Sequence, residues 1–157
     1  MMPEFLIQRW TSSERLDDIM AIVHAAFAEI TPPSGVLSET AADLAARQRN
    51  EVVLVAMAGA DFVGSLFCAR KGDALYLTRM ATRPDWRKRG VGRALMEEAD
   101  RLASAGGQAK LLIRVRKSLP GNLAYFTAKG FVVTGEGQDP GREPYDVMER
   151  YLLARKT

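Results

Sequence analysis

The chain has 157 residues, of which 47% are hydrophobic and 26% are charged, as expected for a globular protein with a core of its own. Its net charge of +3 is too small to argue for nucleic-acid binding, and no apolar run approaches the roughly 20 residues of a membrane helix. The first residues lack the basic start and long apolar stretch of a signal peptide. The single cysteine, Cys68, cannot form an internal disulfide, which fits a reducing compartment. We therefore expect one cytoplasmic domain over 1–157 that binds neither nucleic acid nor membrane.

The first half of the chain predicts one strand, two helices and a three-stranded meander. Residues 5–10 have the pattern of a strand, and Thr11 followed by Glu14 matches a capping box before a helix with one apolar face. After a Pro-Pro-Ser-Gly break, a second helix is expected over 38–49. Short turns containing Gly and Asp then favour antiparallel strands over 52–57, 62–69 and 74–81.

The second half predicts alternating helices and strands. A basic loop over 83–89 leads into a helix over 90–105, whose apolar residues recur at helical spacing, and then into a strand over 110–115. A helix between two strands favours a parallel pair. A short helix over 122–129 and strands over 131–134 and 147–153 follow. The order βααβββαβαββ predicts an α/β (α+β) fold with a mixed, mostly antiparallel sheet of about seven strands and helices on both faces.

The most informative segment runs from Arg87 to Leu95, Arg-Lys-Arg-Gly-Val-Gly-Arg-Ala-Leu, at the start of a strongly amphipathic helix. A helix N-terminus has free N–H groups and a partial positive charge, so it binds anions, phosphate above all. Gly90 and Gly92 let the backbone approach a ligand closely, and four basic side chains add positive charge. The segment therefore predicts a pyrophosphate site.

Two other classes of pyrophosphate-binding protein do not fit this segment. A nucleoside-triphosphatase loop needs Gly-Lys-Ser/Thr, which is absent here. A dinucleotide-binding turn needs three spaced glycines early in a βαβ unit, whereas this segment has two glycines and follows an antiparallel meander in mid-chain.

The segment from Arg87 to Gly92 resembles the Arg-x-x-Gly-x-Gly acyl-CoA motif of the GNAT acetyltransferases. Upstream, Ala81-Thr82-Arg83-Pro84 is similar to the strand-to-loop passage of that family. Downstream, Tyr125-Phe126-Thr127-Ala128-Lys129-Gly130-Phe131 resembles its aromatic pair followed by Gly-Phe. The resemblance covers most of the chain, because the order of elements also matches. It implies a V-shaped cleft between two splayed strands, acetyl-CoA as cosubstrate and no metal.

The resemblance also implies which residues contact the cosubstrate. A backbone N–H near Met80 or Ala81 would stabilise the oxyanion that develops when an amine attacks the thioester directly, without a covalent enzyme intermediate. The implied cosubstrate contacts are Met80, Ala81, Thr82, Arg87, Lys88, Arg89, Gly90, Val91, Gly92, Arg93, Asn122 and Phe126.

One position departs from the family pattern. The second aromatic residue of the pair is commonly a tyrosine that protonates the leaving thiolate, and here it is Phe126, which has no proton to give. Tyr125 is its neighbour, but adjacent side chains on a helix point about 100° apart. Tyr125 is therefore a candidate acid only if the aromatic pair is shifted by one residue; otherwise water or another side chain supplies the proton.

Several single residues have both a structural and a functional interpretation. Glu39, near the start of the second helix, either stabilises the helix dipole or lies in the acceptor pocket, where it steers a cationic amine or takes its proton through water. Tyr145 either packs at a strand edge or contacts the acceptor. Asn122 caps the short helix, touches the pantetheine arm, or does both. His24 is expected to be structural and Cys68 inert.

We expect an acyltransferase that acetylates a primary amine of a small molecule in a ternary complex. Acetylation of a protein N-terminus or lysine is the first alternative, and a non-catalytic acyl-CoA sensor, which Phe126 would suit, is the second. A homodimer is left open as the assembly state.

Overall fold

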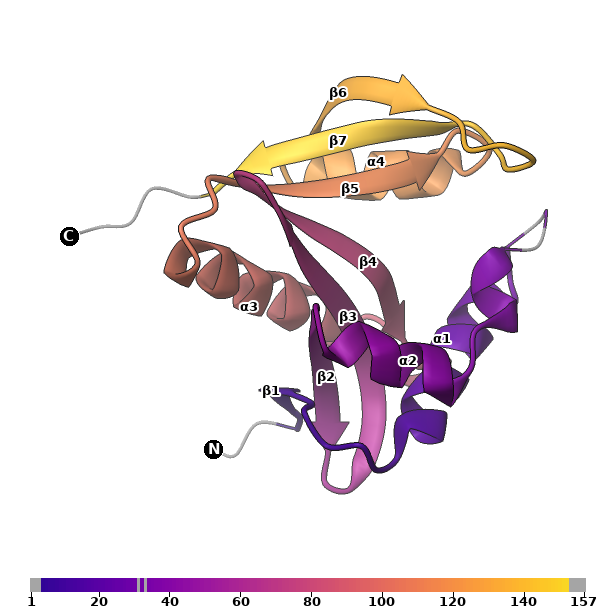
Figure 1. Cartoon of the computed structure of the whole chain (residues 1–157), viewed down its shortest axis with the longest axis vertical. Coiled ribbons are helices and arrows are strands. Elements are labelled where there is room, and N and C mark those ends of the chain that lie inside the picture. Colours follow the sequence, from indigo (N-terminus) through magenta and orange to yellow (C-terminus); the bar gives the residue numbers. More distant parts are fainter. Residues whose placement is uncertain (1–3, 31, 33, 153–157) are drawn as a thin grey trace. The chain divides into compact units, whose positions relative to one another are not determined.

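The computed structural model describes residues 4–30, 32 and 34–152, and its strands form one seven-stranded sheet in the hydrogen-bonded order β1-β2-β3-β4-β5-β7-β6 (Figure 1). The elements in chain order are β1 (Leu6–Arg9), α1 (Leu16–Phe27), the 3₁₀ helix η1 (Gly35–Ser38), α2 (Ala41–Gln48), β2 (Val52–Ala58), β3 (Asp61–Lys71), β4 (Ala74–Thr82), the 3₁₀ helix η2 (Pro84–Trp86), α3 (Val91–Ala105), β5 (Lys110–Arg116), α4 (Pro120–Ala128), β6 (Val132–Gly137) and β7 (Tyr145–Tyr151).

The directions of the strands confirm the mixed, mostly antiparallel sheet. Strands β1 and β2, β2 and β3, β5 and β7, and β6 and β7 pair antiparallel. Strands β4 and β5, which are linked through α3, pair parallel, with Leu75 opposite Leu111 and Tyr76 opposite Leu112. The predicted order of helices and strands is therefore correct, and the parallel pair lies where the helical connection placed it.

The chain divides into two compact units. The first runs up to Ala69 and includes Arg79–Ala99; the second comprises Arg70–Thr78 and the chain from Asp100 onward. No helix in the described ranges is long and apolar enough to cross a membrane.

Helices cover both faces of the sheet in the first unit. On one face, α1 and α2 bury apolar side chains against alternate residues of β2, including Val53 and Val55, and against Phe67 of β3. On the other face, the start of α3 lies directly on Gly64 of β3, where an added Cβ would be 2.6 Å from Cγ1 of Val91. The single cysteine, Cys68 on β3, is 1% exposed.

The starts of the first two helices differ from the sequence prediction, because α1 begins at Leu16 and α2 begins at Ala41, later than the expected residue 38. The expected Thr11–Glu14 capping box is wrong, since α1 begins only at Leu16. The hydroxyl of Ser12 instead accepts a hydrogen bond from the Glu14 N–H at 2.9 Å, a local turn that competes with the helix. A complete capping box occurs at α2, where the side chain and backbone of Thr40 exchange hydrogen bonds with Asp43.

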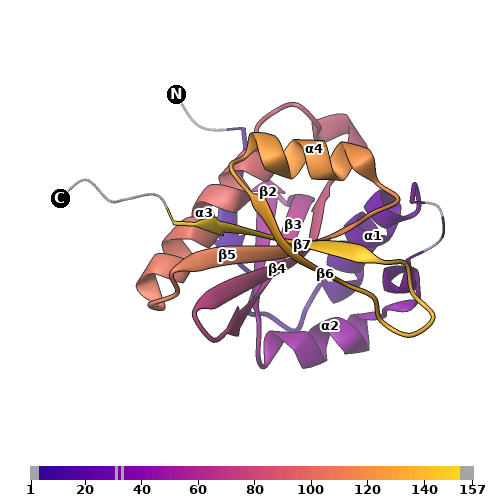
Figure 2. The ribbon, with the colours of Figure 1, turned by 90° about the horizontal axis from the view of Figure 1, so that it is seen from above.

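In the second unit, β5, β7 and β6 run side by side and α4 packs on β5 (Figures 1 and 2). Helix α4 begins at Pro120 after Leu119, so Asn122 lies in its first turn, and the expectation that Asn122 caps the helix is wrong. The last strand begins at Tyr145, two residues earlier than predicted, and the predicted end at residue 153 lies outside the described residues.

Candidate active site

The turn before α3 has an unusual backbone conformation. Lys88 and Gly90 both have positive φ, 62° and 85°, so two residues of this turn have φ in the positive, left-handed range. Glycine adopts this conformation without a steric penalty, which explains its use at position 90. The Gly90 carbonyl accepts the first helical hydrogen bond from the Ala94 N–H at 3.0 Å. The N–H groups of the first helical turn, from Val91 onward, have no partner within the helix and can donate to phosphate oxygens.

Basic side chains around this turn are exposed and only loosely paired. Arg87 contacts Glu29 at 3.0 Å, and Arg93 contacts Glu97 at 3.1 Å. The Arg89 guanidinium lies 4.6 Å from the centroid of the Trp86 ring. Exposed ion pairs of this kind contribute little free energy, so these arginines can exchange their partners for a phosphate at small cost.

Strand β4 carries a backbone irregularity directly before Met80. Arg79 has a φ of 51°, in the left-handed region that a residue with a Cβ rarely adopts. The hydroxyl of Ser65, which is fully buried on β3, donates to the Arg79 carbonyl at 3.1 Å. The Thr78 hydroxyl, on the other side of Arg79, is buried and has no hydrogen-bond partner within the described residues. A ligand lying along β4 could satisfy it.

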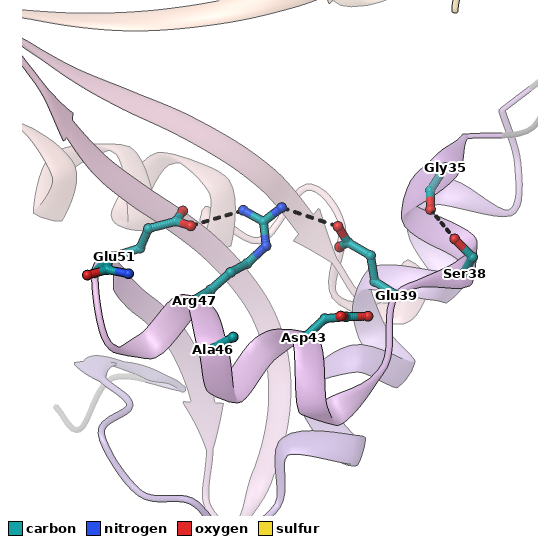
Figure 3. Close-up of a pocket in the computed structure, with 8 residues that line it drawn as sticks. Gly35, Ser38, Glu39, Asp43, Ala46, Arg47 and Glu51 are labelled. Atoms are coloured by element: carbon teal, nitrogen blue, oxygen red, sulfur yellow. Dashed lines mark hydrogen bonds and ion pairs between the residues drawn. The ribbon is translucent and has the colours of Figure 1, made fainter. Parts of the chain in front are cut away.

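Glu39 directly follows η1, two residues before α2 begins, and is paired with two arginines. Its carboxylate accepts from Nε of Arg79 at 2.7 Å and from Nη2 at 2.5 Å, a bidentate pair. Arg47 of α2 donates to Glu39 at 3.2 Å and to Glu51 at 3.0 Å, so its guanidinium lies between two carboxylates (Figure 3). His24 of α1 contacts the Glu39 carbonyl oxygen through Nε2 at 2.8 Å.

These contacts decide the charge of Glu39. Partial burial alone would raise the pKa of its carboxyl, but the hydrogen bonds and charges of Arg79 and Arg47 outweigh it and hold the pKa below its ordinary value. A carboxylate with a lowered pKa is a weaker base, so the environment of Glu39 favours a permanently ionised partner for arginine over a proton acceptor.

An open pocket of about 530 Å³ lies along this cluster on the first unit. Its lining comes from η1, α2 and their flanks and includes Ser38, Glu39, Asp43, Arg47 and Glu51 (Figure 3). Three of these side chains are carboxylates and one is a guanidinium, so the lining is acidic overall.

The aromatic pair lies on α4 in the second unit. The Phe126 ring is half-buried and meets the rings of Phe131 and Tyr125 edge-to-face, with centroids 5.6 and 5.1 Å apart. Tyr125 is 42% exposed, and partial burial raises the pKa of its hydroxyl, which keeps the group protonated at neutral pH. The Phe126 ring is therefore packed against two other aromatic rings. The neighbouring Tyr125 has a protonated hydroxyl, which phenylalanine does not have.

Tyr145 packs against its own unit. The guanidinium of Arg114 on β5 lies 4.7 Å from the Tyr145 ring centroid, and a Cβ added at Gly137 would be 2.6 Å from the Tyr145 hydroxyl. These contacts agree with the packing interpretation, and a role toward the acceptor stays a prediction. Asn122 is exposed on the first turn of α4.

The first unit thus holds Met80, Ala81, Thr82, Glu39 and the turn over 87–93, and the second holds Asn122, Tyr125, Phe126 and Tyr145. Sequence reasoning missed Arg79 and Ser65, which join Glu39 to the backbone of β4. The sequence gives no local signal for either residue, because their partners lie 40 and 14 positions away in the chain.

A glycine-containing turn that follows the central strand of a mixed sheet and opens an amphipathic helix is the arrangement expected of an acyl-CoA-dependent acyltransferase. Residues 49–133, more than half of the chain, match the family model of the acetyltransferase (GNAT) domain. The chain therefore belongs to the GNAT acetyltransferase family and is an acyltransferase. Comparison with curated proteins gives no match.

Several solved structures share the fold at low identity. Ard1 from Thermoplasma volcanium is 18% identical, with a TM-score of 0.81 over 96% of this chain and 99% of that one. The PaiA N-acetyltransferase from Thermoplasma acidophilum, solved in complex with coenzyme A, is 17% identical, with a TM-score of 0.78 over 94% and 98%. The ribosomal-protein-S18-alanine N-acetyltransferase from Escherichia coli is 19% identical, with a TM-score of 0.70 over 97% and 96%. Such likeness identifies the fold and leaves the acceptor open.

Proposed function

We propose that this GNAT protein transfers an acetyl group from acetyl-CoA to a primary amine of a small molecule. The observation that supports acetyl-CoA as the cosubstrate is the turn before α3. There, Lys88 and Gly90 have left-handed backbone conformations and lead into a helix start surrounded by exposed arginines. The coenzyme A in the complex of the Thermoplasma acidophilum relative supports the same assignment. The turn fits a pyrophosphate, because it offers unpaired N–H groups and positive charge at one place.

The proposed acetyl transfer requires few catalytic side chains. The amine nitrogen bonds to the thioester carbonyl carbon, the C–S bond breaks, and the thiolate takes a proton. A backbone N–H at Met80 or Ala81 is the proposed donor to the carbonyl oxygen as negative charge develops on it. Since a thiolate is a stable leaving group, water can supply the last proton, and the phenylalanine at position 126 does not prevent turnover.

The acidic pocket beside α2 supports a small cationic acceptor. Its volume of about 530 Å³ is within the usual range for small-molecule sites. The carboxylates of Glu39, Asp43 and Glu51 outnumber the guanidiniums of Arg47 and Arg79 that pair with them, so a net negative charge remains to attract a protonated amine. The relatives of similar fold include an acetyltransferase of a ribosomal-protein alanine, so a peptide acceptor is the alternative outcome of the experiment below.

The test is a panel of small amines, polyamines, lysine peptides and free peptide N-termini, each incubated with acetyl-CoA while release of the CoA thiol is followed. We expect turnover with small amines. Turnover confined to peptides would overturn the acceptor assignment. Binding of acetyl-CoA without turnover on any amine would identify a sensor. Binding itself is checked by thermal unfolding, since a ligand at about 100 times its Kd stabilises the native state by roughly 2.7 kcal/mol.

The proton donor is tested separately with two single-atom changes. Phe126→Tyr adds one hydroxyl and should change the rate by less than about 10-fold, because general acid help is small when a thiolate leaves. Tyr125→Phe removes one hydroxyl and should also have little effect. A loss of more than about 100-fold in Tyr125→Phe, with acetyl-CoA binding intact, would identify Tyr125 as the acid.

Location and assembly are part of the same proposal. The single cysteine is buried and suits a reducing cytoplasm. Val132 and Val133, 61% and 52% exposed on the edge strand β6, support a homodimer that covers this edge. Light scattering after gel filtration distinguishes a dimer from a monomer.

A further inference from the structure

We propose that Glu39 and Arg79 form an ionic clamp that holds β4 in the conformation that presents the Met80 N–H to the thioester carbonyl. Glu39 is then a positioning residue that acts through Arg79, and the reaction does not use it as a base. This inference rests on the proposed function, because it assigns a purpose to the backbone beside Met80.

The clamp is needed because Arg79 is strained. Its φ of 51° places the Cβ close to the following carbonyl oxygen, a conformation that residues other than glycine avoid. Such a residue persists only where its surroundings hold it, and residues of this kind concentrate at functional sites. A strand with ordinary φ at position 79 would rotate the next peptide group, and so the N–H of Met80.

Arg79 is held through both its main chain and its side chain. The buried Ser65 hydroxyl donates to its carbonyl at 3.1 Å, which fixes the peptide between Arg79 and Met80. The two guanidinium contacts to Glu39, at 2.7 and 2.5 Å, fix the side chain in two directions. Arg79 and Glu39 are 14% and 18% exposed, so water competes weakly for these contacts.

Glu39 is in turn anchored to α1 and α2. Arg47 joins it to Glu51, and His24 contacts its main-chain oxygen at 2.8 Å. The capping box of the next residue, Thr40, fixes the start of α2. A carboxylate anchored at so many points, with both oxygens already accepting from guanidinium groups, is suited to orient a partner and poorly suited to collect a proton.

Four forms of the full chain test the clamp: Glu39→Gln, Arg79→Gly, the double variant, and Asp18→Asn as a control that breaks the exposed Arg15–Asp18 pair. Misplacement of a catalytic group by a fraction of an ångström to one ångström lowers rates strongly, so we expect kcat of Glu39→Gln to fall roughly 10- to 100-fold. The Kd of acetyl-CoA should stay within about 2-fold, because the phosphate turn is untouched.

The double variant separates the clamp from the alternatives. Glycine adopts the left-handed conformation without help, so adding Arg79→Gly to Glu39→Gln should restore kcat at least about 5-fold. If Glu39 were the base, glycine at position 79 could not restore activity. If the ion pair only stabilised the fold, kcat measured well below the melting temperature would not change in any form. Unchanged kcat in Glu39→Gln, or no recovery in the double variant, overturns the clamp.

An NMR measurement keeps this test independent of the acceptor. In ¹⁵N-labelled protein, Glu39→Gln should shift the Met80 amide signal and accelerate its hydrogen exchange, and the double variant should reverse part of both changes. Asp18→Asn should leave this signal in place. An unmoved Met80 signal in Glu39→Gln overturns the clamp even if the wild-type protein acetylates no amine in the panel, whereas absence of turnover alone counts only against the proposed function.

Discussion

Substitution of Gly64 by alanine should loosen the start of α3 from the sheet. The new Cβ would lie 2.6 Å from Cγ1 of Val91 and 3.1 Å from the Ala81 carbonyl oxygen, and real Cβ atoms do not approach other heavy atoms closer than 3.0 Å. Val91 is 1% exposed and β-branched, so it cannot rotate away, and the helix itself must move. Overpacking of this kind costs about 1–3 kcal/mol of unfolding free energy.

Urea unfolding with linear extrapolation measures this loss, and titration with acetyl-CoA measures its effect on the phosphate turn. We expect acetyl-CoA affinity to fall together with stability, because Gly90 and Val91 move with the helix. Gly121→Ala is the matched control: its Cβ would meet nothing within 4 Å, and alanine in a helix is neutral or stabilising. A Gly64→Ala protein within about 0.5 kcal/mol of the wild type, with normal acetyl-CoA binding, would refute this account of the contact.

Three further predictions use other contacts. Asp100→Asn leaves Arg150, 14% exposed and paired to Asp100 at 2.5 and 2.6 Å, without its counter-charge, and urea unfolding should show a loss of about 1–3 kcal/mol. Because the pKa of Glu39 is lowered on folding, its stabilising effect is fully present above its ordinary value near 4.5 and is lost as pH falls through the lower folded value. The melting temperatures of wild type and Glu39→Gln should therefore differ at pH 7 and converge as the pH is lowered through the folded pKa of Glu39. Gly92→Val should weaken CoA binding at least ~10-fold in a titration while circular dichroism stays native.

Long elements with one apolar face were predictable from the sequence. The helix over 90–105 was found from its repeating apolar residues, and the parallel pairing of its flanking strands followed from the connection it makes. The positive φ of Gly90 agrees with the glycine chosen there. Local signals were less dependable at helix starts: the Thr11–Glu14 pattern was overridden by the shorter-range bond from Glu14 to Ser12, which the pattern cannot reveal.

The residues of the candidate site and their interactions could be predicted only in part. The turn over 87–93 is a contiguous motif, so its place before a helix was evident from the sequence. The chemistry of Glu39 was not evident, because it depends on Arg79, 40 residues away, and on Arg47. Nor does an arginine within a strand indicate a left-handed φ, since residues with a Cβ disfavour that region and only tertiary contacts impose it.

Because Cys68 is buried, thiol reagents can be used both to assay this protein and to probe its dynamics. With its single thiol 1% exposed on β3, the folded enzyme should react with Ellman's reagent far more slowly than released CoA, so a colorimetric assay carries almost no background from the protein. Conversely, at long times the slow modification of Cys68 reports how often β3 opens. The labelling rate, compared with and without acetyl-CoA, therefore measures the opening of this strand without any engineered label.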